Sequence, residues 1–213
     1  MQSHLFIKYS KNRKQNNFCL FLLSGFIRSL LVCGIILNDL ASCYFIVLML
    51  GGHSYGGAVI TNAAHNNPNV TGLVYIAAFA PDEGQSLSTF VNPANFPKEL
   101  FMPDSGGFIY LNPKIFRENF AQDVDPAEAT VMAITQKPFH QSNFVAPSGP
   151  PAWKELPTWY QISDADRMIP PDVQRTFAQQ MNATTLNLNT SHASYVSYPT
   201  EIADFILNAT KGK

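Results

Sequence analysis

A serine set between two glycine pairs is the feature that most constrains this chain. The pentapeptide Gly52-His53-Ser54-Tyr55-Gly56 fits the pattern Gly-x-Ser-x-Gly, and a continuous apolar run, residues 45–50, precedes it. Such a run predicts a strand buried on both faces, and the small residues 58–64 predict a helix after it. A sharp strand-to-helix turn of this kind holds its serine in a strained backbone conformation with an exposed hydroxyl. The alternative interpretation is an ordinary glycine-rich turn.

The residues after this turn predict the centre of a parallel sheet. A second buried strand is expected over residues 72–78, so that strand, helix and strand form a βαβ unit. No charged residue occurs between Asp39 and Asp82, which favours a central position in the sheet. The regular pattern returns later in two strands, residues 159–163 and 184–188, and in two amphipathic helices that open at Pro171 and after Pro199.

The residues between the first βαβ unit and the strand at 159–163 lack a regular pattern of apolar positions. Residues 81–157 contain many prolines and scattered aromatic residues, and their apolar positions show no sustained period. We interpret them as short helices and loops that cover a site, with the clearest helix over residues 127–135. The sequence thus predicts an α/β domain over residues 45–213 with a cap insertion at about residues 85–156.

Acidic and basic side chains follow the last two expected strands in an order that suits nucleophilic catalysis. A serine hydroxyl needs a general base, and the base needs an acid that fixes its tautomer and stabilises the imidazolium. Asp164 and Asp166 follow one strand, and His192 follows the other. Because the carboxyl ends of parallel strands meet at one edge of a sheet, these residues are expected beside Ser54. Spacing does not separate the two aspartates, and either could instead cap the next helix.

Composition excludes several classes of function. The chain has 213 residues, and a net charge near −1 provides no basic surface for nucleic acid. An aromatic content of 12% with 14% charged residues is far from that of a disordered chain. All three cysteines, Cys19, Cys33 and Cys43, precede the α/β region, which therefore has no disulfide framework or zinc-binding spacing. We expect a cytoplasmic protein that uses neither a metal nor an organic cofactor.

Residues 1–44 form a separate basic and apolar segment. Most of residues 18–37 are apolar and four basic residues precede them, as in a signal peptide or signal anchor. Arg28 interrupts this run, at a cost of about 2.5–3.5 kcal/mol in a membrane-spanning helix, and no cleavage site of small residues is evident. We therefore favour a buried strand and helix, or a sequence foreign to the fold, over a membrane anchor.

Three short stretches resemble the α/β-hydrolase family, and within it the branch of small esterases and hydroxynitrile lyases. They are residues 52–61, 166–171 and 191–193, and the resemblance extends over about residues 46–213. It implies the α/β-hydrolase fold, a mostly parallel sheet flanked by helices and covered by a cap.

The same resemblance assigns roles to individual residues. It implies that Ser54 is the nucleophile, His192 the base and Asp166, in preference to Asp164, the acid that orients the base. It further implies that the backbone N–H of Tyr55 donates one hydrogen bond to the oxyanion of the reaction.

The chain departs from the family pattern ahead of the strand-to-helix turn at Ser54, which we call the elbow. The family's second oxyanion donor comes from a loop that begins His-Gly after an earlier strand, and no His-Gly occurs in the first 53 residues. The nearest substitute is a strand over residues 18–23 that ends in Ser24-Gly25-Phe26, followed by a crossover helix over residues 27–43. The alternative is a truncated amino terminus that lacks several strands.

These observations lead to one main functional hypothesis with two alternatives. The main hypothesis is hydrolysis of a small carboxylic ester through a Ser-His-Asp triad and an acyl-enzyme. The same fold also supports lyase, thioesterase or amidase chemistry. The other alternative is a catalytically impaired scaffold that binds a small apolar ligand, motivated by the missing oxyanion loop. The oligomeric state is left open.

Overall fold

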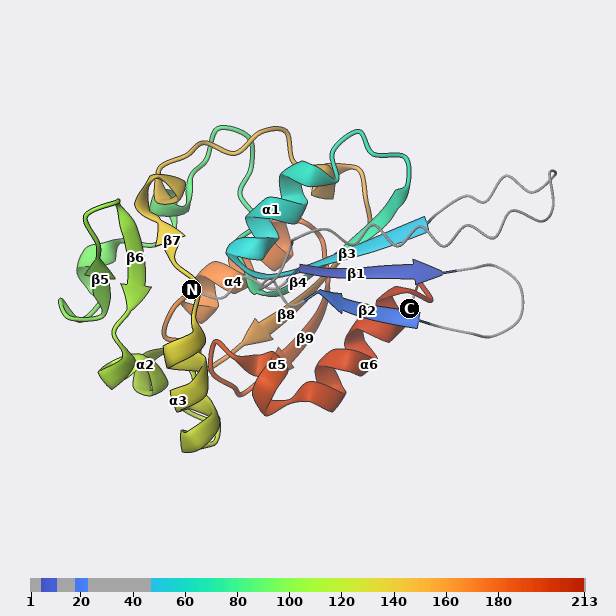
Figure 1. Cartoon of the computed structure of the whole chain (residues 1–213). Coiled ribbons are helices and arrows are strands. Elements are labelled where there is room, and N and C mark those ends of the chain that lie inside the picture. Colours follow the sequence, from blue (N-terminus) through green and yellow to red (C-terminus); the bar gives the residue numbers. More distant parts are fainter. Residues whose placement is uncertain (1–4, 11–17, 23–46, 213) are drawn as a thin grey trace, which may run out of the picture.

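The computed structural model describes residues 5–10, 18–22 and 47–212, and these include a six-stranded sheet (Figure 1). The strand order is β2-β1-β3-β4-β8-β9. The strands are β1 Leu5–Ser10, β2 Phe18–Leu22, β3 Val47–Ser54, β4 Val70–Ala78, β8 Thr158–Ser163 and β9 Thr184–Leu188. The last four strands are parallel to one another, whereas β1 runs antiparallel to both β2 and β3.

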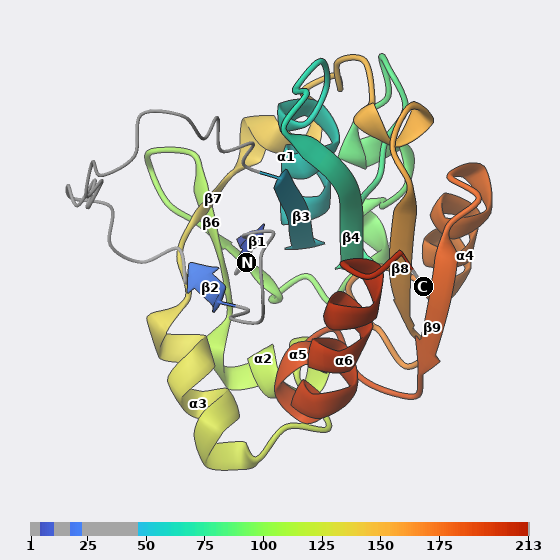
Figure 2. The same ribbon diagram turned by 90° about the vertical axis from the view of Figure 1, so that its right-hand side faces the viewer.

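Both faces of the strand β4 are buried, and its residues from Leu73 to Ala78 are accordingly apolar at consecutive positions. Leu73 and Tyr75 face the helices α1 (Tyr55–Ala63) and α4 (Pro171–Gln180), in a core that extends to Tyr160. Val74 and Ile76 point the other way, against the helix α6 (Pro199–Ala209). Figure 2 shows α1 and α6 on opposite sides of β3 and β4. Burial on both faces explains the continuous apolar run in this strand.

Proline and capping residues set where several helices begin. The helices α2 (Pro113–Phe120), α3 (Pro126–Thr135), α4 and α6 all carry proline in the first turn, where its missing N–H costs no hydrogen bond. Asn112 caps α2 and Asp125 caps α3, each through a side-chain oxygen that accepts from backbone N–H groups of the first turn. The short helix α5 (Ser194–Ser197) precedes α6.

The segment between β4 and β8 forms its own layer beyond the carboxyl ends of the parallel strands (Figure 1). It contains α2 and α3, a small sheet of order β5-β6-β7, and 3₁₀ turns at Leu87–Thr89, Pro93–Asn95, Gln141–Phe144 and Ala152–Lys154. Its strands are β5 Phe101–Pro103, β6 Phe108–Leu111 and β7 Phe139–His140. A second apolar core joins α2 and α3 to Met168 and Ala193, which lie in loops at the edge of the main sheet.

The predicted strands and helices from residue 47 onward are confirmed, with shifted ends. The helix expected over residues 58–64 begins three residues earlier, directly after Ser54, and the strand expected over residues 72–78 begins at Val70. Of the two alternatives for the amino terminus, the one with a strand over residues 18–23 agrees with β2 at residues 18–22. The turn at Ser24-Gly25-Phe26 and the crossover helix over residues 27–43 lie outside the described residues.

The sequence did not predict β1. The basic residues of this region, Lys8 among them, suggest only the flank of an apolar run, yet Leu5–Ser10 pair with both β2 and β3. Within the described ranges of the chain, no helix is both long enough and apolar enough to cross a membrane.

Candidate active site

Ser54 lies at a strained turn between β3 and α1. Its backbone φ is 56° and ψ is −124°, a conformation that residues with a Cβ seldom adopt. Gly52 permits this turn, because a Cβ there would lie 2.4 Å from the backbone carbon and oxygen of Gly56. The Ser54 side chain is buried, and its Oγ has no hydrogen-bond partner among the described residues. The turn thus places the Ser54 hydroxyl at the end of a central strand, as predicted, but the hydroxyl is buried and not exposed as the sequence pattern led us to expect.

His192 and Asp166 form a buried pair at the same edge of the sheet. His192 follows β9 and Asp166 follows β8, and the distance from His192 Nδ1 to Asp166 Oδ2 is 2.7 Å. Both side chains are completely shielded from solvent. The carboxylate is the acceptor, so Nδ1 carries a proton, and in the neutral form of the ring the lone pair is therefore on Nε2. Among the described residues Nε2 has no hydrogen-bond partner.

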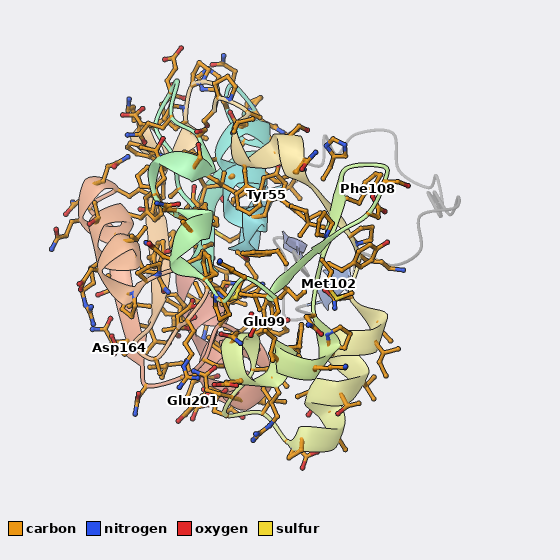
Figure 3. All side chains as sticks on the ribbon, turned by 90° about the vertical axis from the view of Figure 1, so that its left-hand side faces the viewer. Tyr55, Glu99, Met102, Phe108, Asp164 and Glu201 are labelled. Carbon is orange, nitrogen blue, oxygen red and sulfur yellow. The ribbon has the colours of Figure 1, made fainter. Side chains whose placement is uncertain are left out.

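Asp164 is turned away from this pair. Its carboxylate accepts a hydrogen bond from Arg175 on α4, at 2.5 Å, and both side chains are partly exposed. Figure 3 shows Asp164 at the outer edge of the molecule, whereas Tyr55 lies centrally at the start of α1. The structure therefore brings Asp166, and not Asp164, against His192.

The Asp166 carboxylate is fixed by three donors besides His192. Its Oδ1 accepts from the backbone N–H groups of Met168 at 2.7 Å and Ile169 at 3.0 Å, and its Oδ2 accepts from Gln174 Nε2 at 2.8 Å. Hydrogen bonds to a charged acceptor are the strong ones, and this set satisfies a buried carboxylate. The carboxylate can therefore neither rotate freely nor turn toward solvent.

Gln174 is a residue that the sequence reasoning missed. It is fully buried on α4, where it also donates to the Ile169 carbonyl and accepts from the Ser163 N–H at the end of β8. The Gln174 amide thus connects the end of β8, the loop at Ile169 and the Asp166 carboxylate. The sequence offers one signal: Gln174 is a polar residue next to Val173 on α4. That helix was predicted from its apolar residues alone.

His53 is a second missed residue, because the pattern treats it as a variable letter. Its ring is fully buried, and Nε2 lies 2.8 Å from the His192 carbonyl oxygen, to which it donates. The two imidazole rings have centroids 4.6 Å apart, and the Tyr195 ring lies 4.8 Å from that of His53. The elbow therefore also holds the backbone of the loop that carries His192.

Tyr160 fixes the chain that follows β4. Its hydroxyl donates to the Ala78 carbonyl and accepts from the Ala78 N–H, next to Ala77 with φ of 42°. The N–H of the next residue, Phe79, donates to the Ser54 carbonyl at 3.1 Å. Burial raises the pKa of Tyr160 well above its usual range, so this hydroxyl keeps its proton and remains a donor.

Tyr55 contributes its backbone and its ring at different places. It is the first residue of α1, where an N–H has no acceptor within the helix and carries the positive end of the helix dipole. Its ring packs edge-on against Phe139 of β7, with centroids 4.9 Å apart, and burial raises the pKa of its hydroxyl. The Tyr55 N–H thus lies directly after Ser54 and has no acceptor within its own helix.

A small apolar cavity lies where Met168 and Ile169 of the Asp166 loop meet the segment between β4 and β8, and none of Ser54, Asp166 and His192 lines it. Its volume is only about 10 Å³, roughly one water-sized sphere. Phe79, Met168 and Ile169 line it from the sheet side, and all its other lining residues are apolar as well, namely Val91, Phe96, Phe101 and Phe144. A wider groove of about 430 Å³ runs along the outside of α1 and includes Tyr55 but none of Ser54, Asp166 and His192.

This fold and this arrangement define an α/β hydrolase. The sequence profile of the alpha/beta hydrolase family matches residues 32–205, so the chain belongs to that family and the protein is a hydrolase. The family match includes β3, β4, β8 and β9, together with the loops that carry Asp166 and His192.

Particular relatives include a pyrethroid hydrolase of Sphingobium wenxiniae, 31% identical over 74% of this chain and 61% of the relative. An alpha/beta hydrolase of Aspergillus novofumigatus is 26% identical over 76% of this chain and 69% of the relative. The crystal structure of a pyrethroid hydrolase of Sphingobium faniae superposes with a TM-score of 0.62 at 28% identity, over 75% of this chain and 69% of that chain. The chain thus spans between three fifths and seven tenths of these relatives.

Proposed function

We propose that this protein hydrolyses small carboxylic esters, with Ser54 as nucleophile, His192 as general base and Asp166 as the acid that orients the base. One observation carries the proposal: two buried reactive atoms, Ser54 Oγ and His192 Nε2, have no partner among the described residues, while the rest of the His192–Asp166 pair is satisfied. Native proteins rarely leave buried polar atoms unpaired, and such atoms are typical of functional sites.

The chemistry follows from the proton positions. Ser54 Oγ attacks the ester carbonyl carbon while its proton passes to His192 Nε2, and the carbonyl oxygen becomes an oxyanion. His192 then gives that proton to the departing alcohol, which leaves an acyl group on Ser54. Water then loses a proton to the same nitrogen and attacks the acyl carbon. The bond between that carbon and Ser54 Oγ breaks, His192 returns the proton to Oγ, and the carboxylic acid is released. Asp166 stays ionised and stabilises the imidazolium in both steps.

The Tyr55 N–H is the proposed oxyanion donor. It stands at the amino end of α1, where the helix dipole favours negative charge, and it needs no reorganisation to meet the oxyanion. A preorganised donor of this kind is worth about 10²–10³ in rate.

The substrate class follows from the lining of the cavity. Aromatic and aliphatic side chains surround it, so an apolar acyl or alcohol group is favoured over a charged one. We propose that residues 85–156 act as a cap, which must shift to admit such a group because a cavity of about 10 Å³ holds no more than one water-sized sphere. The pyrethroid hydrolases among the relatives are consistent with an apolar ester.

The test is hydrolysis of a short-chain p-nitrophenyl ester by the parent protein and by Ser54→Ala. We expect steady turnover by the parent and a loss of at least about 10³-fold in the variant. Ser194→Ala is a suitable control, since it removes another fully buried serine hydroxyl that hydrogen-bonds Gln161. Equal rates for the parent and Ser54→Ala would refute the proposed nucleophile.

A second probe separates catalysis from ligand binding. A fluorophosphonate reacts only with an activated serine, so it should label the parent and spare Ser54→Ala. A well-folded parent that resists the reagent and hydrolyses no ester would support the alternative of an impaired scaffold that binds an apolar ligand.

A further inference from the structure

The connection between α2 and α3 contacts both loops that carry the proposed base and acid. Asp123 Oδ2 accepts from the Thr190 hydroxyl at 2.6 Å and from the Ser191 N–H at 2.9 Å, directly before His192. The neighbouring Gln122 donates through Nε2 to the Ala165 carbonyl at 2.6 Å, directly before Asp166. Two adjacent residues of the covering segment therefore bind two different loops. The residues that these loops bring into contact, Asp166 and His192, are 26 positions apart in the sequence.

The partners of these bonds are buried, while the carboxylate is accessible. Thr190 and Ser191 are almost completely shielded from solvent, whereas Asp123 is an exposed residue. Hydrogen bonds from buried donors to an ionised acceptor are stronger than neutral ones, and their loss leaves the donors unsatisfied. The accessibility of Asp123 means that it can be replaced without opening the core.

The connection is itself held in place. Arg117 on α2 donates through Nη2 to the Gln122 carbonyl at 3.2 Å and through Nε to the Val124 carbonyl at 3.3 Å. Val124 is buried in the same apolar core that contains Met168 and Ala193, the neighbours of the acid and base loops. The hydrogen bonds of Gln122 and Asp123 therefore lie next to an apolar core that packs the same connection against the two loops.

We infer that Gln122 and Asp123 are positioning residues, which align His192 with Asp166 by fixing the backbone immediately before each of them. The inference rests on the proposed function. It adds that the segment covering the site also sets the geometry of the pair beneath it, so that the alignment of base and acid depends on the seating of this segment. A misplacement of about 1 Å at such a site can cost about 10² in rate.

The experiment compares Asp123→Ala with Asp123→Asn and with Asp125→Ala. Alanine removes the acceptor, whereas asparagine can keep a carbonyl oxygen at the position of Oδ2. Asp125 lies two residues away and caps α3 through Ala127 and Glu128, so its loss weakens the same segment without touching the His192 loop. It is therefore a matched structural control.

On a p-nitrophenyl ester we expect Asp123→Ala to lower kcat about 30-fold with KM changed less than about 3-fold. Asp123→Asn should recover kcat to within about 3-fold of the parent. Asp125→Ala should lower the unfolding temperature but leave kcat within about 2-fold. A similar kcat for Asp123→Ala and the parent, or an equal loss in Asp125→Ala, would overturn the positioning role.

A second readout does not depend on turnover. A proton shared between His192 Nδ1 and a buried carboxylate gives a far-downfield proton NMR signal, visible only while it is protected from solvent exchange. We expect this signal in the parent and in Asp123→Asn, and its loss or broadening in Asp123→Ala. An inactive parent with this pattern would refute the proposed hydrolysis but retain the positioning role, and an unchanged signal in Asp123→Ala would refute that role.

Discussion

Replacement of Gln174 by leucine tests whether a buried amide holds the proposed acid in place. Gln174 Nε2 donates to Asp166 Oδ2 and to the Ile169 carbonyl, each at 2.8 Å, and Oε1 accepts from the Ser163 N–H at 2.9 Å. Leucine has nearly the same volume but makes none of these bonds. The substitution therefore removes polar contacts with little change in packing.

The expected loss of stability can be estimated from the groups left behind. The Ser163 N–H and the Ile169 carbonyl lose this partner in a buried site, while Asp166 Oδ2 keeps its contact with His192. Each orphaned buried group costs about 1–3 kcal/mol. We therefore expect the free energy of unfolding to fall by about 4 kcal/mol, and kcat to fall about 10-fold because Asp166 gains freedom to rotate.

The assay is urea unfolding followed by the fluorescence of the two buried tryptophans, Trp153 and Trp159. Gln180→Leu is the control, because Gln180 is an exposed residue of the same helix and should change the free energy by less than about 0.5 kcal/mol. If Gln174→Leu lost less than 1 kcal/mol and kept the parent's kcat, as judged against the ~1–3 kcal/mol expected per orphaned group, the amide would have no holding role.

Three further outcomes test the turn at Ser54, the proposed acid Asp166 and the hydrogen bonds of Asp123. Gly52→Ala should prevent folding, since the new Cβ would lie 2.4 Å from Gly56 backbone atoms, whereas Gly106→Ala, with its nearest contact at 3.4 Å, should fold; soluble yield and circular dichroism decide. Asp166→Asn should lower kcat about 10⁴-fold and Asp164→Asn less than about 3-fold, measured by ester hydrolysis. Burial raises the pKa of Asp123, but hydrogen bonds from Ser191 and Thr190 outweigh it and leave the pKa below its ordinary 3.8. The parent's stability advantage over Asp123→Asn should therefore be constant above about pH 4 and shrink as the pH falls through the lowered pKa, in thermal unfolding at several pH values.

Sequence reasoning found the elements whose causes are local. The apolar run of β4, the prolines at helix starts and the glycines around Ser54 each obey a rule that acts over a few residues, so these parts could be predicted. The register of the strands and the hydrogen bonds between distant residues could not be predicted from the sequence. The partner of His53 lies 139 positions away and that of Asp123 lies 67 and 68 positions away, so nothing near either residue identifies its contact.

The choice between the two aspartates shows the same limit in one loop. Asp164 and Asp166 differ by two positions after the same strand, and both orientations were compatible with the spacing. The loop backbone decides: the Asp164 N–H donates to the Leu188 carbonyl and the Asp166 N–H to the Ser163 carbonyl, which directs one carboxylate to Arg175 and the other inward. Only the folded loop contains this information.

The register of the first strands bears on the second oxyanion donor. Leu5 of β1 lies opposite both Leu22 of β2 and Gly52 of β3, so the carboxyl end of β2 reaches the same edge of the sheet as the elbow. Two interstrand spacings separate β2 from β3, which is about 10 Å. A donor that followed β2 would have to reach over β1 to meet an oxyanion beside Ser54.

If the Tyr55 N–H acts alone, catalysis should still depend on Ser54 but run about 10²–10³-fold more slowly than with two donors. Slow turnover abolished by Ser54→Ala would therefore indicate a site with one donor, whereas rapid turnover would indicate that a second donor contributes.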